Sequence, residues 1–160
     1  MLGERLRHNV EQLIAKYSAR LRTDPLTPMA KRLLPALIED HAMSYFGDLF
    51  QSLVILEKSD DLEGREESDL MNDGSQIQRL IAELHGRQRH RLGWTEEALH
   101  REYQIIDEEV ESLLRQHSSG SDRNRLEWAL GVLKRMLNAA HDASFAAFHA
   151  AEKDAAGTAR

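Results

Sequence analysis

Residues 85–103 read HGRQRHRLGWTEEALHREY and contain a change of direction between two segments with helical patterning. Gly93 is typical of the residue that follows a helix C-terminus, because glycine adopts the left-handed conformation at low cost. Thr95 can then cap the next helix with its hydroxyl, and Glu96 and Glu97 would lie at the positive end of that helix dipole. The stretch therefore predicts two helices joined at a tight corner.

Apolar residues recur at helical spacing on both sides of this corner. In the helix expected over residues 75–92, the apolar stripe is Ile77, Leu80, Ile81 and Leu84. In the helix expected over residues 95–117, a heptad stripe is formed by Leu99, Tyr103, Ile106, Val110, Leu113 and His117. A heptad stripe is suited to packing against a neighbouring helix at a shallow angle.

Four further helical segments are expected, over residues 3–22, 28–35, 36–57 and 123–153. A threonine before Pro28 signals a helix start, and Pro35 predicts a kink or a fresh start. The segment over 36–57 is apolar over a wide arc, which indicates a central place in the core or at a subunit contact. The last helix would extend about 45 Å, longer than a domain of this size is wide.

These six segments predict an all-α fold, a globin-like or up-down helical bundle with a long C-terminal helix. A chain of 160 residues is about one domain long. We expect a single helical domain over residues 1–153, followed by a flexible tail or linker over 154–160.

Composition and charge exclude several classes of function. Charged residues make up 30% of the chain and hydrophobic residues 41%, as in soluble proteins with long solvated helix faces. The net charge of −6 argues against nucleic-acid binding, which depends on clustered Lys and Arg. There is no cysteine for disulfides or thiolate zinc sites. No apolar run approaches the roughly 20 residues of a membrane helix, so we predict a cytoplasmic protein without membrane contact.

An acidic segment over residues 59–73 carries seven Asp and Glu residues against a single arginine. We interpret it as a solvated loop with at most a turn of helix. The spacing lacks the D-x-D-x-D-G order of a calcium-binding EF-hand loop.

Histidine spacing does not predict a metal site. His85 and His90 are five residues apart and would point about 140° away from each other on a helix. Glu97 and His100 form one Glu-x-x-His pair, whereas a carboxylate-bridged di-iron bundle uses two. Nothing resembles a nucleophile elbow or a phosphate-binding glycine loop. We therefore expect no metal, no cofactor and no enzymatic activity, with haem held by a single histidine left as an alternative.

The polar residues of the opening stretch have a structural interpretation. If the two helices fold back across Gly93, Arg89 and Glu102 can form a charge-assisted contact, and Trp94 can cover the corner. With His85 and Tyr103 they would form a polar cluster that fixes the helix pair or acts as a switch.

Six positions in and after this stretch form the pattern H-x3-R-x3-G-x5-L-x2-E-Y, namely His85, Arg89, Gly93, Leu99, Glu102 and Tyr103. The pattern resembles the N-terminal helical domain of bacterial RsbT co-antagonist proteins of the stressosome type, which also occurs ahead of sensor histidine kinases. LLPALIEDHAMSYFGDLFQSL, residues 33–53, resembles the preceding helices of that family, and the similarity covers most of residues 30–115.

The resemblance implies an all-helical sensory or adaptor module, related to globin-like folds without haem, usually dimeric and not itself catalytic. Two features depart from the family pattern. One is the acidic segment over 59–73, and the other is that neither a phosphorylatable regulatory module nor a kinase core follows in this chain.

The leading hypothesis is therefore a sensory input domain that passes a signal along its C-terminal helix. We expect a homodimer that pairs through the 95–117 helix and the last helix. The dimer or signal residues on the last helix would be Leu126, Leu130, Leu133, Leu137, Phe145 and Phe148. Expected partners are bacterial kinases or stressosome components, and a small-molecule ligand or pH acting through His85 could bias the helix pairing. The alternative is a metal-, haem- or small-ligand-binding helical-bundle enzyme.

Overall fold

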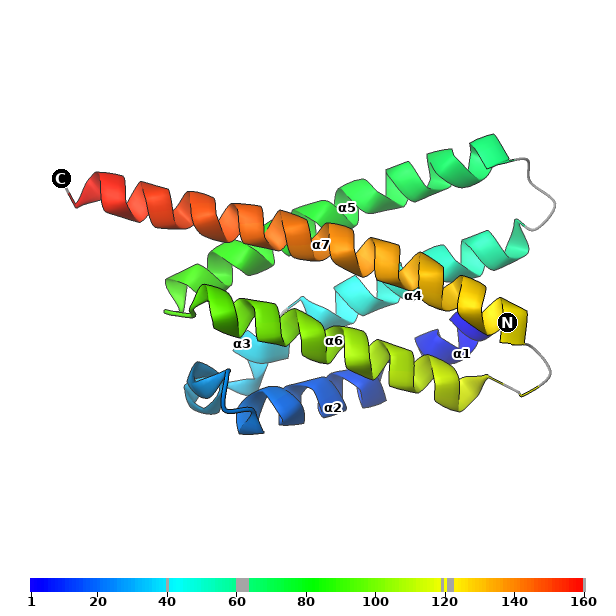
Figure 1. Cartoon of the computed structure of the whole chain (residues 1–160), viewed down its shortest axis with the longest axis horizontal. Coiled ribbons are helices and arrows are strands. Elements are labelled where there is room, and N and C mark those ends of the chain that lie inside the picture. The colour runs from blue at the N-terminus through cyan, green and yellow to red at the C-terminus, as the bar shows by residue number, and fades with distance from the viewer. Residues whose placement is uncertain (40, 60–63, 119, 121–122, 160) are drawn as a thin grey trace.

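The computed structural model of the chain describes residues 1–39, 41–59, 64–118, 120 and 123–159, and for residues 64–75 it describes the helix path alone. The regular structure in these ranges is entirely helical, and no strand occurs in them. The helices are α1 (Leu2–His8), α2 (Val10–Thr23), the 3-10 helix η1 (Pro28–Arg32), α3 (Pro35–Glu39), α4 (Ala42–Lys58), α5 (Gly64–Arg91), α6 (Glu96–His117) and α7 (Arg123–Thr158). The predicted all-α bundle with a long C-terminal helix is confirmed (Figure 1).

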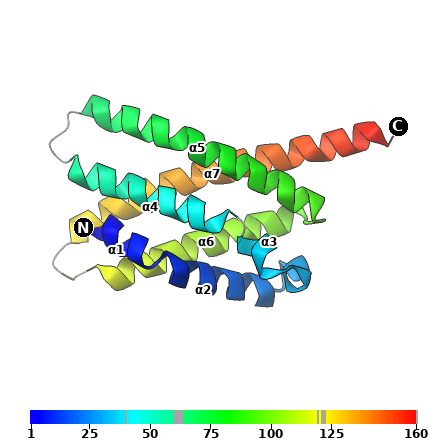
Figure 2. The same ribbon diagram turned by 180° about the vertical axis from the view of Figure 1, so that it is seen from behind.

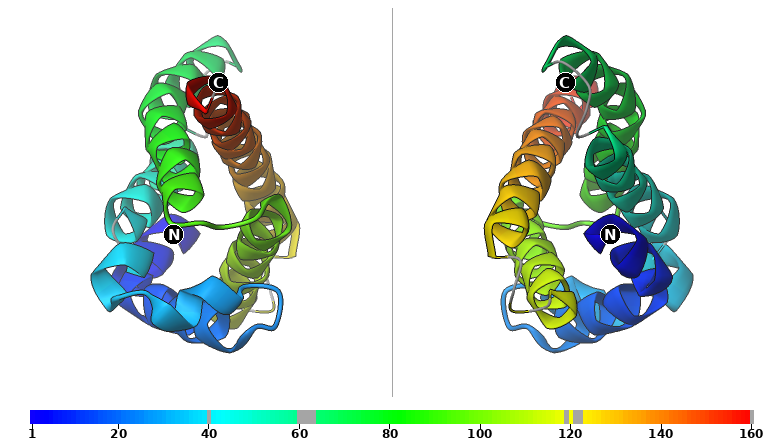
Figure 3. Two further views of the ribbon diagram at one scale, coloured as in Figure 1. Left: turned by 90° about the vertical axis from the view of Figure 1, so that its left-hand side faces the viewer. Right: turned by 90° about the vertical axis from the view of Figure 1, so that its right-hand side faces the viewer.

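The helices form a ring around one core. α7 packs against α5 and α6, α5 against α4, α4 against α1 and α2, and α2 against α6. The end-on views of Figure 3 show this ring, and Figure 2 shows α1 and α2 on the side away from α7. Each helix of the ring thus has at least two neighbours on which to bury an apolar face.

The core is built from apolar stripes that the sequence predicts. α4 is central, since its side chains over a wide arc are buried, among them Phe46, Leu49, Phe50 and Leu53. The heptad stripe of α6 is buried from Leu99 to Leu113 against α2 and α7. Burying such side chains contributes about 1.5–3 kcal/mol each, which makes these two helices the main apolar supports of the fold.

Two predicted boundaries differ from the structure. The helix expected over 3–22 breaks at Asn9, whose side-chain Nδ2 donates to the carbonyl of Arg5 at 2.7 Å and so competes with the backbone ladder. The loop predicted over 59–73 is wrong for residues 64–73, because α5 begins at Gly64; residues 60–63 lie outside the described ranges. The acidic segment contains no proline, and glutamate, leucine and methionine are good helix formers, so charge alone did not exclude a helix.

α5 turns most of its apolar stripe outward, whereas Ile81 of that stripe packs against the core. Ile77, Leu80 and Leu84 are 59%, 55% and 40% exposed. On the opposite face, a Cβ added at Gly86 would lie 2.0 Å from the carbonyl oxygen of Ser144 in α7. α5 and α7 therefore cross in direct backbone contact, and glycine is the residue that fits at the crossing.

α7 is longer than the body of the bundle. Its last buried residue is Phe148, and the helix continues to Thr158, past the end near residue 153 that the sequence suggests. The residues beyond it project from the bundle as a rod (Figure 1). Within the part of the chain that the structure describes, none of the helices combines the length and apolar character needed to span a bilayer.

Candidate functional site

The corner between α5 and α6 has the geometry that its sequence predicts. Gly93 has φ +79°, its N–H donates to the carbonyl of His90, and the N–H of Trp94 donates to the carbonyl of Arg89, both at 3.0 Å. These two bonds form a Schellman motif. Thr95 caps α6 by accepting from the N–H of Ala98 at 3.1 Å. The corner fixes how the last turn of α5 faces the first turns of α6.

Across this corner, Arg89 and Glu102 form a fully buried ion pair, which confirms the predicted contact. Both side chains are 0% exposed. Arg89 Nη2 donates to Glu102 Oε1 at 2.7 Å, and Arg89 Nε donates to Glu102 Oε2 at 3.1 Å. Two parallel bonds of this kind fix the orientation of both side chains as well as their separation.

The remaining donors of Arg89 are also satisfied, mostly by backbone. Nη1 donates to the carbonyl of Leu37 at 3.0 Å and to the side chain of Gln88 at 3.4 Å. Nη2 also donates to the carbonyl of Ile38 at 3.3 Å. Leu37 and Ile38 belong to α3, the short helix that begins at Pro35, so one guanidinium ties α3, α5 and α6 together.

Tyr17 brings α2 into the same cluster. Its hydroxyl donates to Glu102 Oε1 in a short hydrogen bond, and it lies 3.5 Å from Arg89 Nη2. Tyr17 was not among the predicted cluster residues, because it lies in an apolar stripe of the first expected helix with Leu6, Val10, Leu13 and Leu21. The signal available was that this stripe contains one hydroxyl among aliphatic residues.

Trp94 covers the pair from the solvent side, as predicted. The guanidinium carbon of Arg89 lies 4.5 Å from the centre of a Trp94 ring, a cation–π contact. Trp94 is buried, and it replaces water on one face of the guanidinium. Burial by an aromatic ring strengthens the Arg89–Glu102 attraction because the local dielectric is low.

The pair is ionised in the fold. Burial acts to raise the pKa of Glu102, but the charge of Arg89, the nearby His85 and the hydrogen bonds from Arg89 outweigh it, so the pKa lies well below the ordinary 4.5. Burial likewise opposes the charge of Arg89, and Glu102 overcomes it, so the pKa of Arg89 is raised. The pKa of Tyr17 is raised by burial and by the neighbouring carboxylate, which keeps the hydroxyl a donor.

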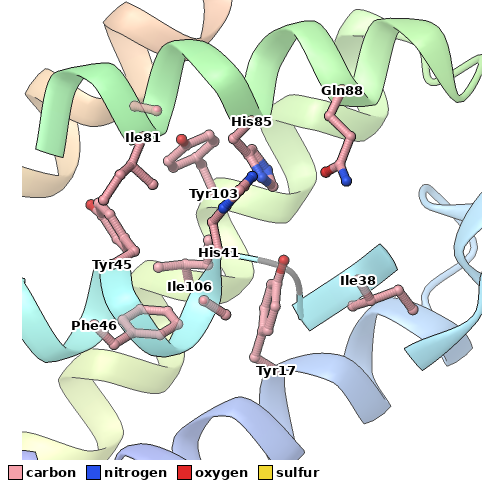
Figure 4. A pocket seen from close by; sticks show the side chains of 12 residues that line it. Tyr17, Ile38, His41, Tyr45, Phe46, Ile81, His85, Gln88, Tyr103 and Ile106 are labelled. Atoms are coloured by element: carbon pink, nitrogen blue, oxygen red, sulfur yellow. The ribbon is translucent and has the colours of Figure 1, made fainter. Parts of the chain in front are cut away.

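A pocket lies beside the ion pair, between α2, α3, α4, α5 and α6 (Figure 4). Its polar groups include the side chains of His41, Tyr45, His85 and Tyr103, and its walls include aliphatic and aromatic side chains. About 30 Å³ is open to the centre of a water-sized molecule, room for about two waters. The Tyr45 hydroxyl is buried without a hydrogen-bond partner, an arrangement that costs about 1–3 kcal/mol unless something accepts or donates there.

Two of the predicted cluster residues connect the ion pair to this pocket and to α7. His85 places Nε2 3.0 Å from Glu102 Oε2, in a direction that does not make a hydrogen bond. Tyr103 stands edge-on to His85, with ring centres 6.0 Å apart, and lies 5.0 Å from the ring of His141 in α7. All five predicted cluster residues are thus brought together, and Tyr103 is the one that reaches α7.

The predicted dimer surface of α7 needs correction. Leu126, Leu130, Leu133, Leu137 and Phe148 are buried in the core of the single chain. Phe145 is partly buried and packs against that core. A second copy cannot contact these residues without opening the bundle, because α5 and α6 already cover them. The periodic stripe was identified correctly, but its partner is within the chain.

Among the described residues, no group of three or more His, Asp or Glu side chains could hold a metal ion. The corner cluster offers no open position either, since the oxygens of Glu102 face Arg89, His85 and Tyr17. The Arg89–Glu102 pair can orient helices and hold charge in a dry site.

Comparison of the chain with protein-family models, with curated proteins and with solved structures finds no match.

Proposed function

We propose that this chain is a non-catalytic sensory or regulatory input domain of a bacterial signalling protein. The observation that carries the proposal is the enclosed state of the Arg89–Glu102 pair. Every N–H of the guanidinium has a protein partner, and neither side chain reaches solvent. Such a pair holds helices in one arrangement, whereas a catalytic group must touch its substrate.

The resemblance of residues 30–115 to the RsbT co-antagonist N-terminal domain supports the signalling class. By that resemblance, the partners are kinases or stressosome components. The cluster supports it further, because the residues of the family-like pattern are the ones that join α5 to α6.

The input in this proposal is a change in the pocket beside the cluster, caused by a small molecule no larger than the roughly two waters for which the pocket has room. The change would be transmitted to α7 through Tyr103, which borders the pocket and lies against His141 of α7. The change could also be transmitted through α5 itself, because Gly86, one turn before Arg89, lies against the backbone of Ser144 in α7. The projecting end of α7 is then the output.

The dimer in this proposal pairs through α5 of two copies. Ile77, Leu80 and Leu84 repeat at helical spacing and face solvent. The ion pair of Arg79 and Glu83 lies on the exposed part of the same helix, so both charge signs border the stripe. A helix face of this kind can meet its own copy across a two-fold axis, since the interface is then self-complementary.

Size-exclusion chromatography with light scattering tests the dimer. Wild type should elute as a dimer at micromolar concentration, and Leu80→Glu with Leu84→Glu should be monomeric with unchanged helicity. Leu34→Glu is the matched control, because Leu34 is exposed but lies outside α5. A wild-type monomer at high micromolar concentration would contradict the α5 interface.

An absorbance spectrum and elemental analysis of the purified protein test the non-catalytic proposal against the bundle-enzyme alternative. A haem band would favour the alternative. So would a stoichiometric metal that persists when His100, which is exposed, and His141, which is partly buried, are replaced. Neither result is expected if the cluster only holds helices.

A further inference from the structure

A pair of histidines faces each other across the seam between α6 and α7. His100 Nδ1 lies 3.2 Å from His141 Nε2, and the ring centres are 5.1 Å apart. His100 is exposed and His141 is partly buried. No local pattern predicts this pair, because the two residues are 41 positions apart on different helices.

The rings are held in place by their neighbours. Phe145 stands edge-on to both, with its centre 6.1 Å from His100 and 4.5 Å from His141. Tyr103 supports His141 from the other side at 5.0 Å. Gln104, one turn after His100, places its side-chain Nε2 3.2 Å from His100 Nε2. The two ring nitrogens that face each other are thus held in position by the packing of neighbouring side chains.

The pair opens on a groove in the same seam. About 140 Å³ of it is open to the centre of a water-sized molecule, and its lining includes Gln104, Asp107 and Asn138 beside the two histidines. The groove has room for an ion with several waters, and it contains oxygen atoms that can hydrogen-bond to them.

The separation of the two nitrogens fits a shared metal ion. Zinc binds histidine nitrogen at about 2.0–2.1 Å, so two nitrogens 3.2 Å apart would subtend about 103° at the ion, close to the tetrahedral angle of about 109°. Imidazole nitrogen is also a preferred ligand of copper and nickel. We propose that His100 Nδ1 and His141 Nε2 form a site for a divalent transition-metal ion, zinc above all, with water at the remaining positions.

A bound ion would tie α6 to α7 at the level of Tyr103. The metal site does not depend on the proposed sensory function, and either can fail without the other.

Isothermal titration of metal-free full-length protein with zinc chloride tests the site. Wild type should bind one ion per chain. His100→Ala and His141→Ala should each weaken binding by at least the roughly 10–100-fold that loss of a supporting group costs. His8→Ala is the matched control, since His8 is an exposed histidine on α1 whose Nδ1 lies 2.7 Å from its own helix carbonyl.

A second measurement keeps the test independent of folding. Zinc should raise the melting temperature of wild type and of His8→Ala, and leave that of His100→Ala unchanged, because an ion that binds only the native state stabilises it. His100 is exposed, so its variant should fold normally. If wild type binds no zinc up to about 1 mM, or if both seam variants bind it as wild type does, the pair is only a histidine–histidine hydrogen bond and the proposal is wrong.

Discussion

Replacing Arg89 with methionine should destabilise the fold by about 3–5 kcal/mol. This is the cost of removing one partner from a buried ion pair, because the other charge is left unpaired in a dry site. The range for an exposed pair is about 0–1 kcal/mol, but Arg89 and Glu102 are both 0% exposed. Glu102 would keep only Tyr17 and His85 as polar partners. For a chain of this length the loss corresponds to a melting temperature lower by about 6–20 °C.

The assay is urea unfolding followed by far-UV circular dichroism for wild type, Arg89→Met, Glu102→Gln and the double variant. Glutamine keeps an acceptor for Tyr17 while it removes the charge. Both single variants should lose stability, and the double variant should lose less than their sum by about 0.5–3 kcal/mol, because no unpaired charge remains. The m-value should stay constant, so that the shift reports stability alone.

Single-variant losses below about 1 kcal/mol would refute the reasoning, since they are the values of a solvated pair. Strictly additive losses would refute it as well, because they would mean that the two side chains do not depend on each other.

Three further predictions follow from the same contacts. Because the pKa of Glu102 is lowered in the fold, the ionised carboxylate stabilises the fold fully above its ordinary pKa near 4.5, and this stabilisation is lost as pH falls below that value. Glu102→Gln should therefore flatten the dependence of the unfolding free energy on pH between about 5 and 3, by up to about 1.4 kcal/mol per pH unit. The exposed control Glu97→Gln should leave that dependence unchanged. Gly86→Ala should cost at least the roughly 1–3 kcal/mol of overpacking in urea unfolding, because its Cβ meets the Ser144 backbone, whereas Gly47→Ala, with open space around it, should gain about 0.5–1 kcal/mol; equal effects would contradict the crossing. Tyr17→Phe should cost about 1.5–3 kcal/mol through loss of the bond to Glu102, whereas Tyr45→Phe removes a buried hydroxyl without a partner and should gain up to about 1–3 kcal/mol; a comparable cost at both positions would contradict these assignments.

The corner between α5 and α6 was predictable because its signals are local. Gly93 and Thr95 act through bonds to residues within a few positions, and these rules hold without knowledge of the rest of the fold. The Arg89–Glu102 contact followed from that corner, since two helices that fold back bring such positions together.

The rest depends on contacts between distant segments. Periodicity gives the apolar face of a helix but not its partner, so the stripe of α7 was assigned to a second copy when α5 and α6 cover it. On α5 the direct backbone contact at Gly86 sets the rotation of the helix and leaves Leu80 and Leu84 outside. Tyr17 is 85 positions from Glu102, and the α3 carbonyls are about 50 positions from Arg89. Both separations are beyond the range of any local pattern.

The central claim is that the buried cluster sets the position of the projecting helix α7. The chain has no cysteine, so spin labels can be placed at Asp48→Cys in α4 and Lys153→Cys in α7 alone. Double electron–electron resonance, with labelled protein diluted into unlabelled protein, then measures the distance between them in the wild-type background and in Arg89→Met/Glu102→Gln. The account predicts a single narrow distance for wild type and a displaced or broadened one for the double variant at unchanged helicity. The same distribution in both would mean that α7 does not respond to the cluster, and would contradict the claim.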